Sequence, residues 1–323
     1  MTQPSSEAVA VPADAGADAR RGMVLGLSSA AGYSAANLAL RELSSVDPEI
    51  GWAIWVSAMK AVPTMILASI LLARRRIRKQ PLYPTTRPVP MLIVAGLVMQ
   101  FGGNLGFQLA LGHIGLAISV PVVFAFIILA GAVLGRVFLG DQVSKRTVLS
   151  ILVMMAAIIL LSFAATQADD SGQRASGYAE GVAWLGLIIA MISGLSYGVN
   201  GVILRHSARR TLPVESVLLI YSTTGVICLA TLGIGLLGFD RLAQVTTAQW
   251  QAMWFAGTFN AIAFFCVVHA LKLLNITQVN VVNAAQNAMC AGGAVLFFNE
   301  PGSPAMILGV LLSIAGLVML DRK

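Results

Sequence analysis

Long apolar runs alternate with short polar connections along almost the whole chain. A helix needs roughly 20 apolar residues to cross about 30 Å of hydrocarbon. Ten segments approach that length, with the limits 23–41, 49–73, 88–111, 116–139, 147–165, 181–204, 213–237, 250–271, 277–298 and 305–320. The connections carry helix breakers, as in "SSVDPE" and "NEPGSP". The pattern predicts an all-α integral membrane protein with ten transmembrane helices.

Composition supports lipid as the solvent of this chain. Hydrophobic residues make up 57% and charged residues 11% of the sequence, whereas a soluble domain carries about 25% charged residues. The three cysteines lie inside apolar runs, which argues against a disulfide framework. The formal charge is +7, but the basic residues cluster in short connections. That pattern is typical of membrane orientation, so we expect a lipid partner and no nucleic acid.

The distribution of basic residues predicts the orientation. Seventeen Lys and Arg residues fall on the side of the N-terminus and three, Arg41, Arg174 and Arg241, on the other. Because Lys and Arg favour the cytoplasmic side, both termini are predicted to be cytoplasmic, in the plasma (inner) membrane. Residues 1–19 are small, polar and acidic, and residues 1–21 are predicted to form a disordered cytoplasmic tail. They lack a cationic region followed by an apolar core, so we do not expect a cleavable signal peptide.

The two halves of the sequence resemble each other. "GYSAANLALR" aligns with "SYGVNGVILR", so that Tyr33 and Arg41 match Tyr197 and Arg205. A five-helix unit at 22–165 is therefore expected to recur at 181–323, after an external linker at 166–180. Because five is odd, the second unit is inverted relative to the first. Inverted repeats are a construction of secondary transporters, whose substrate site lies near the midplane.

Residues 107–162 resemble the EamA repeat of the drug/metabolite transporter superfamily, in which a fourth helix with Pro121 leads to the pair Gly140-Asp141. Residues 269–320 resemble the second copy, with Asn299-Glu300 in place of the pair. The ninth helix departs from the family, since it lacks the proline and carries Asn and Gln instead. The resemblance implies a ten-helix transporter of small metabolites.

Lys60 is the strongest candidate for substrate binding. It lies near the middle of segment 49–73, where a lysine costs roughly 2.5–3.5 kcal/mol on insertion scales. We interpret it as a cation that faces a water-filled cavity and binds a carboxylate or phosphate. The alternative is a lysine that snorkels toward one face or pairs with helix carbonyls.

Amides and tyrosines follow helical spacing in other segments, which predicts a hydrogen-bonding path or, alternatively, contacts between packed helices. Tyr33 and Tyr197 are equivalent in the two units, and an interfacial tyrosine belt is equally compatible with them. The full set of candidate substrate-binding residues is Lys60, Tyr33, Asn37, Gln100, Asn104, Tyr197, Asn200, Asn260, Asn280, Asn283 and Asn287.

The acidic residues favour a structural role. Asp141 and Glu300 follow the fourth and ninth segments, where a carboxylate is expected to cap a neighbouring helix start. No Asp or Glu lies deep in any segment, although ion-coupled pumps usually keep such carboxylates. Facilitated transport or exchange is therefore favoured.

Gly194, Ser196 and Gly198 form a G-x-S-x-G motif, the nucleophile elbow of many hydrolases. An elbow needs a preceding strand, but this motif lies in an apolar helical segment, and we predict that Ser196 is a packing residue. A membrane serine hydrolase using Ser196 and His269 is the weakest alternative. His269 has Cys266 on the same face, but too few ligands stand nearby for a metal site.

These observations predict a secondary transporter, not an enzyme, without cofactor or metal. It would move a small polar metabolite, an amino acid or organic anion, by alternating access and in the direction of export. A membrane receptor or scaffold that binds without transport is the alternative, and a homodimer is left open.

Overall fold

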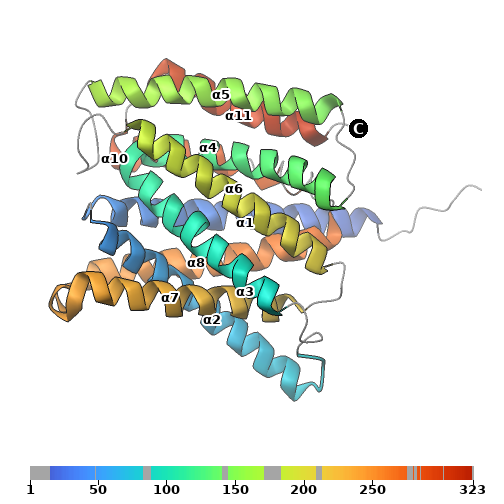
Figure 1. Cartoon of the computed structure of the whole chain (residues 1–323). Coiled ribbons are helices and arrows are strands. Elements are labelled where there is room, and N and C mark those ends of the chain that lie inside the picture. Colours follow the sequence, from blue (N-terminus) through green and yellow to red (C-terminus); the bar gives the residue numbers. More distant parts are fainter. Residues whose placement is uncertain are drawn as a thin grey trace, which may run out of the picture.

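The computed structural model describes residues 15–47, 49–82, 89–139, 145–170, 183–208, 213–274, 279, 282–283, 285–300 and 302–321. Over these residues the elements are helical (Figure 1). They are α1 (Ala15–Ser44), α2 (Ile50–Ile77), α3 (Val89–Leu97), η1 (Val98–Leu105), α4 (Gly106–Leu139), α5 (Lys145–Asp170), α6 (Ala183–Ala208), α7 (Val214–Ala243), α8 (Thr247–Leu273), α10 (Ala285–Phe298) and α11 (Pro304–Asp321). Wherever a predicted apolar segment is described, it is helical, apart from the N-cap residues Glu49 and Pro213.

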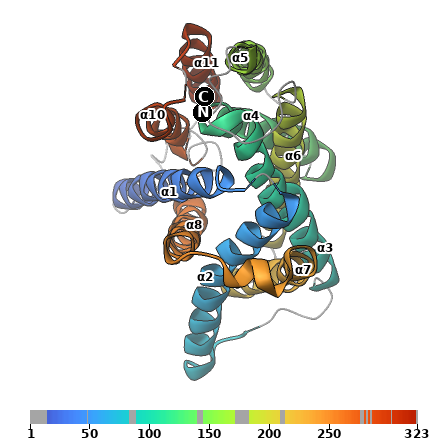
Figure 2. The same cartoon turned by 90° about the vertical axis from the view of Figure 1, so that its left-hand side faces the viewer.

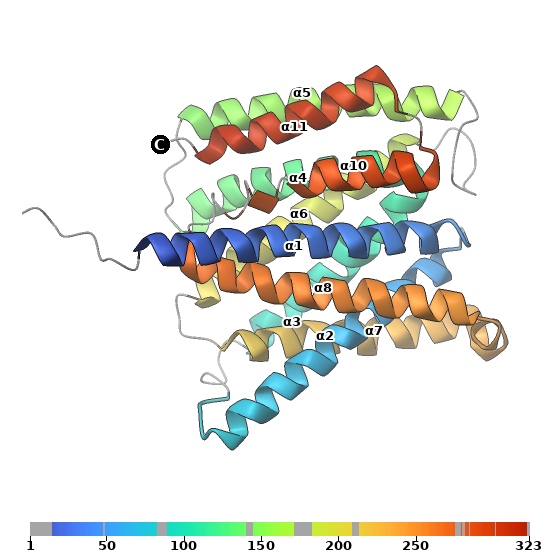
Figure 3. The ribbon, with the colours of Figure 1, turned by 180° about the vertical axis from the view of Figure 1, so that it is seen from behind.

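The helices run roughly side by side in a layered bundle (Figures 1 and 2). α5 and α11 pack together along one edge, and α2 packs on α7 at the opposite edge. Between them α4 packs on α6, and α1 lies between α8 and α10 (Figure 3). α1 begins and α11 ends at the same end of the bundle (Figures 1 and 3). That arrangement agrees with an even number of crossings.

The helices expose apolar side chains on the outside of the bundle. Among the described residues, six spans are long and apolar enough to cross a membrane by length and composition. Large apolar residues such as Val94, Leu152 and Phe297 are exposed, while Trp52 and Leu111 are buried. An exterior of this kind is stable in hydrocarbon and not in water. The protein is a multi-pass membrane protein.

Gly115 divides the longest apolar span. Val89–Phe138 has 50 residues, and an unbroken helix of that length would extend about 75 Å, more than twice the hydrocarbon thickness. Gly115 adopts φ 73° and ψ 178°, which breaks α4 between the predicted segments 88–111 and 116–139. Gly238 breaks α7 in the same way, with φ 72°, directly after the predicted end at residue 237. Both breaks need a glycine because φ is positive.

Two predicted boundaries differ from the structure. α1 begins at Ala15, so residues 15–21 of the predicted disordered tail are helical. Alanines favour helix there, and Arg21 lies 3.9 Å from Asp18 one turn earlier. α5 extends to Asp170, so residues 166–170 of the predicted linker are helical as well. No glycine or proline interrupts the sequence before Gly172, which explains the extension. The rest of the tail and linker lies outside the described residues.

Candidate substrate-binding cavity

A cavity of about 200 Å³ lies among α1, α2, η1, α4, α6, α8 and α10. Seven of the eleven predicted binding residues line it: Tyr33, Asn37, Lys60, Asn104, Tyr197, Asn260 and Asn283. They come from both halves of the sequence. The fold therefore brings together polar side chains that lie far apart along the chain.

Lys60 is buried beside this cavity. Its side chain is 4% exposed, and its ammonium donates to Asn104 Oδ1 at 2.7 Å. The described residues supply this one acceptor, whereas an ammonium group has three hydrogens to donate. The side chain does not snorkel to a surface, and its charge is directed toward the cavity that it lines.

Asn104 joins Lys60 to a chain of hydrogen bonds. Its Oδ1 also accepts from the Tyr197 hydroxyl at 2.7 Å, and its Nδ2 donates to Gln100 Oε1 at 2.8 Å. Gln100 Nε2 in turn donates to the carbonyl of Tyr221 at 2.9 Å. Gln100 is thus a support for Asn104 and does not line the main cavity. The network fixes the orientation of the Asn104 amide, so that its oxygen faces Lys60.

The segment that carries Asn104 is a π-helix, η1. Ser193 of α6 donates to the carbonyl of Gly103 at 2.8 Å. The ring of Tyr197 lies so close to Gly103 that a Cβ there would stand 2.9 Å from the ring. The glycines therefore allow α6 to approach η1 closely. π-Helical turns are frequent at functional sites, and here one positions Asn104.

Three further predicted residues lie elsewhere or are not described. Asn200 donates to the Ser196 carbonyl of its own helix at 2.9 Å. Asn287 is 0% exposed and donates to Ser313 Oγ of α11 at 3.2 Å, so it joins two helices. For these two residues the structure has packing contacts in place of cavity contacts. Asn280 lies outside the described residues.

Sequence reasoning missed part of the lining. Gln286 lines the cavity and stands three residues after Asn283, a spacing that would have indicated it. An apolar wall completes the cavity, formed by Met99, Phe107, Val120, Val123, Phe124, Ile127 and Phe264. These helices are apolar on every side, so no periodicity marked the face that lines the cavity.

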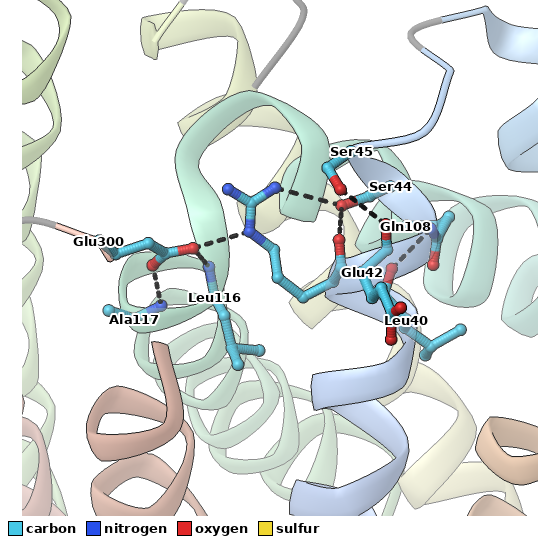
Figure 4. Close-up of polar contacts among 9 residues, drawn as sticks. Leu40, Glu42, Ser44, Ser45, Gln108, Leu116, Ala117 and Glu300 are labelled. Carbon is cyan, nitrogen blue, oxygen red and sulfur yellow. Dashed lines mark hydrogen bonds and ion pairs between the residues drawn. The ribbon is translucent and has the colours of Figure 1, made fainter. Parts of the chain in front are cut away.

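A buried ion pair connects the end of α1 to the segment after α10 (Figure 4). Arg41 Nε lies 2.7 Å from Glu300 Oε1, and the two side chains are 2% and 8% exposed. Glu300 also accepts from the backbone amides of Leu116 at 2.9 Å and Ala117 at 3.1 Å, directly after the break at Gly115. The predicted role of Glu300 as a helix cap is confirmed, whereas Asp141 lies outside the described residues.

The G-x-S-x-G motif lies inside α6. The Ser196 hydroxyl donates to the Ile192 carbonyl at 2.9 Å, and His269 Nδ1 lies 2.8 Å from the Phe265 carbonyl. A Cβ at Gly194 would stand 2.5 Å from the Val123 carbonyl oxygen. The motif is therefore a helix-packing surface. The residues that the structure describes contain no group of three or more His, Cys, Asp or Glu placed to hold a metal.

Comparisons with known proteins agree with this fold. Residues 184–321 match the model of the EamA-like transporter family, which belongs to the drug/metabolite transporter superfamily. The resemblance seen in the sequence is thereby confirmed over residues 184–321, which are similar to a family of membrane transporters.

Solved structures share the architecture. Twenty chains match, and one, described as "Crystal structure of protein", has a TM-score of 0.59 at 15% identity, over 93% of this chain and 96% of its own. At that identity the likeness shows the fold alone. The comparison with curated proteins finds no match.

Proposed function

We propose that the protein is a secondary transporter that moves a small polar metabolite, an organic anion or amino acid, across the plasma membrane by alternating access. The observation that carries the proposal is the cavity with one buried ammonium, Lys60, and neutral hydrogen-bonding groups around it. Buried intramembrane charges mark substrate paths. The apolar wall opposite suits a substrate with an apolar part.

The proposed architecture is ten crossings in two inverted five-helix units, at 22–165 and 181–323. Gly115 lets the 50-residue span supply two crossings, and three shorter apolar helices supply further ones. The packing is nearly symmetric, which supports the proposal. In the proposed repeat, α1 corresponds to α6, η1 to α8 and α4 to α10. The contact of α1 with α8 is then equivalent to that of α6 with η1, and the contact of α1 with α10 is equivalent to that of α6 with α4. α2 packs on α7, its equivalent in the other unit, and α5 packs in the same way on α11.

Alternating access requires that the two ends of the bundle close in turn. The Arg41–Glu300 pair joins α1, the second part of α4 and the segment after α10, so it holds one end together. By the distribution of basic residues, this is the external end. We propose that the pair separates when the cavity opens outward.

Counterflow in proteoliposomes tests transport. Liposomes preloaded with a pool of unlabelled amino acids and organic anions should accumulate labelled members of the same pool, and protein-free liposomes should not. Vesicles of known protein orientation then distinguish export from import. Binding without flux would instead favour the receptor or scaffold.

Labelling tests alternating access. In a variant without Cys228, Cys266 and Cys290, the substitution Asn37→Cys places a single thiol in the cavity. That thiol should react with an impermeant maleimide added from either side. Reaction from one side alone, with and without substrate, would contradict alternating access.

A further inference from the structure

A smaller pocket of about 30 Å³ adjoins the main cavity. The two share the lining residues Lys60, Met99, Asn104, Asn260 and Phe264. The smaller pocket continues between α2 and α7, where Thr64, Gln100, Tyr221 and Ser222 add further polar side chains to its wall. Lys60 therefore stands at the boundary, with the small pocket on one side and the large cavity on the other.

Two hydroxyl groups in the small pocket have no hydrogen-bond partner among the described residues. They belong to Thr64, which is 9% exposed, and Tyr221, which is 3% exposed. Thr64 follows Lys60 by one helical turn, so both lie on the same face of α2. Leaving a buried polar group unsatisfied costs about 1–3 kcal/mol. Two such groups on residues that line one pocket with Lys60 indicate a site built for a ligand.

Three other polar side chains of the pocket, Ser222, Gln100 and Asn104, are already engaged. The Ser222 hydroxyl donates to the Leu218 carbonyl at 2.7 Å. Gln100 and Asn104 bond to each other, and Asn104 Oδ1 accepts from Lys60 and Tyr197. The groups left over are two hydroxyls, the Lys60 ammonium and the Asn260 amide, all of which can donate. Donors beside a positive charge fit an anion.

Size and charge narrow the ligand further. A volume of about 30 Å³ exceeds the roughly 10–15 Å³ that one water needs, so the pocket admits a small group such as a carboxylate. None of the described residues that line either pocket is acidic, so no carboxylate pairs with the ammonium of an α-amino acid. The larger cavity, with its apolar wall, is left for the body of the ligand.

We propose that the small pocket binds the carboxylate of an organic monoanion through Lys60, Thr64 and Tyr221, while its apolar body occupies the larger cavity. The inference rests on the proposed transport function and specifies its substrate class. Monocarboxylates without an amino group are bound in preference to the corresponding amino acids and amides.

Matched probes test this selectivity in the purified full-length protein by calorimetry. They are 3-phenylpropanoate, its neutral amide and L-phenylalanine, together with butyrate and 4-methyl-2-oxopentanoate. The expected result is that at least one monocarboxylate binds, and that 3-phenylpropanoate or the best-bound acid exceeds its amide and its amino acid by about tenfold or more. Equal affinity for acid and amide, or no binding by any acid, would overturn the inference.

Isosteric variants locate the site. Thr64→Val and Tyr221→Phe each remove one hydroxyl with little change in shape. Each should weaken carboxylate binding about tenfold, the size of one charge-assisted hydrogen bond, and leave amide binding unchanged. Ser222→Ala is the matched control, because its hydroxyl is already bonded within α7. Unchanged carboxylate affinity in both variants would overturn the assignment of these hydroxyls to the anion.

Flux separates this inference from the proposed function. Counterflow of amino acids or neutral compounds without a preference for carboxylates would overturn the monoanion site and leave the transporter. Selective carboxylate binding without counterflow would leave the site and overturn transport.

Discussion

The substitution Glu300→Gln removes one negative charge from a buried cluster while keeping the size of the side chain. Glu300 pairs with Arg41 at 2.7 Å and accepts the two backbone amides that start the second part of α4. Glutamine retains one acceptor oxygen, and its amide NH₂ must face either a guanidinium or a backbone N–H. Both are donors, so at least one of these contacts is lost.

The structure sets the expected magnitude. Removing one member of a buried ion pair costs about 3–5 kcal/mol, because the remaining charge stays buried without its carboxylate. The pair is 2% and 8% exposed, so solvent does little to reduce this cost. We therefore expect Glu300→Gln to lower the free energy of unfolding by about 3–5 kcal/mol. Measurement is by reversible unfolding with sodium dodecyl sulfate in mixed micelles, followed by circular dichroism.

A second ion pair provides the control. Arg21 lies 3.9 Å from Asp18, and these two side chains are 76% and 49% exposed. Exposed pairs contribute about 0–1 kcal/mol, so Arg21→Gln should have a small effect. The reasoning would be refuted if both variants lost less than about 1 kcal/mol, or if both lost the same amount.

Further variants test packing and the cavity. Gly115→Ala should lower the free energy of unfolding by about 1–3 kcal/mol, because alanine disfavours a positive φ. The new Cβ would also stand 2.6 Å from Glu300 Oε1, which adds to the destabilisation. An unchanged melting temperature would contradict this. Ser196→Ala should retain stability and flux, whereas Gly194→Val should give less folded protein on size-exclusion chromatography. Lost flux in Ser196→Ala together with a normal folded yield of Gly194→Val would instead indicate a special role for the serine. Tyr197→Phe removes one hydrogen bond to Asn104, so the apparent Michaelis constant for counterflow should rise about fivefold, for about 1 kcal/mol; no change would place Tyr197 outside the path.

Much of the fold could be predicted because membrane helices are marked by long apolar runs. The break at Gly115 was also predictable, since the apolar span is too long for one crossing. The helical extension of α1 to Ala15 was missed, because polarity indicated a tail while local helix propensity favoured helix. The partnership of Arg41 with Glu300 depends on tertiary packing, which no local pattern records.

The candidate site was predictable as a set of polar residues and not as an arrangement. Polarity within apolar helices identified Lys60 and Asn104, which bond to each other. The same signal also selected Asn287, whose amide joins α10 to α11. Lining a cavity and joining two helices both satisfy the hydrogen bonds of an amide in hydrocarbon, so the sequence pattern does not distinguish these two roles. Thr64 and Tyr221 were missed because isolated hydroxyls are common in membrane helices.

Counterflow by wild type and Lys60→Met tests the central claim most directly. Methionine keeps most of the length of the side chain and removes the charge. Ser196→Ala, purified and reconstituted in the same way, serves as the control. Wild type and the control are expected to accumulate labelled organic anion from the preloaded pool, while Lys60→Met, folded and inserted to the same extent, is expected to lose that flux. Flux in Lys60→Met at the wild-type rate would contradict a role for the buried ammonium in the transport path.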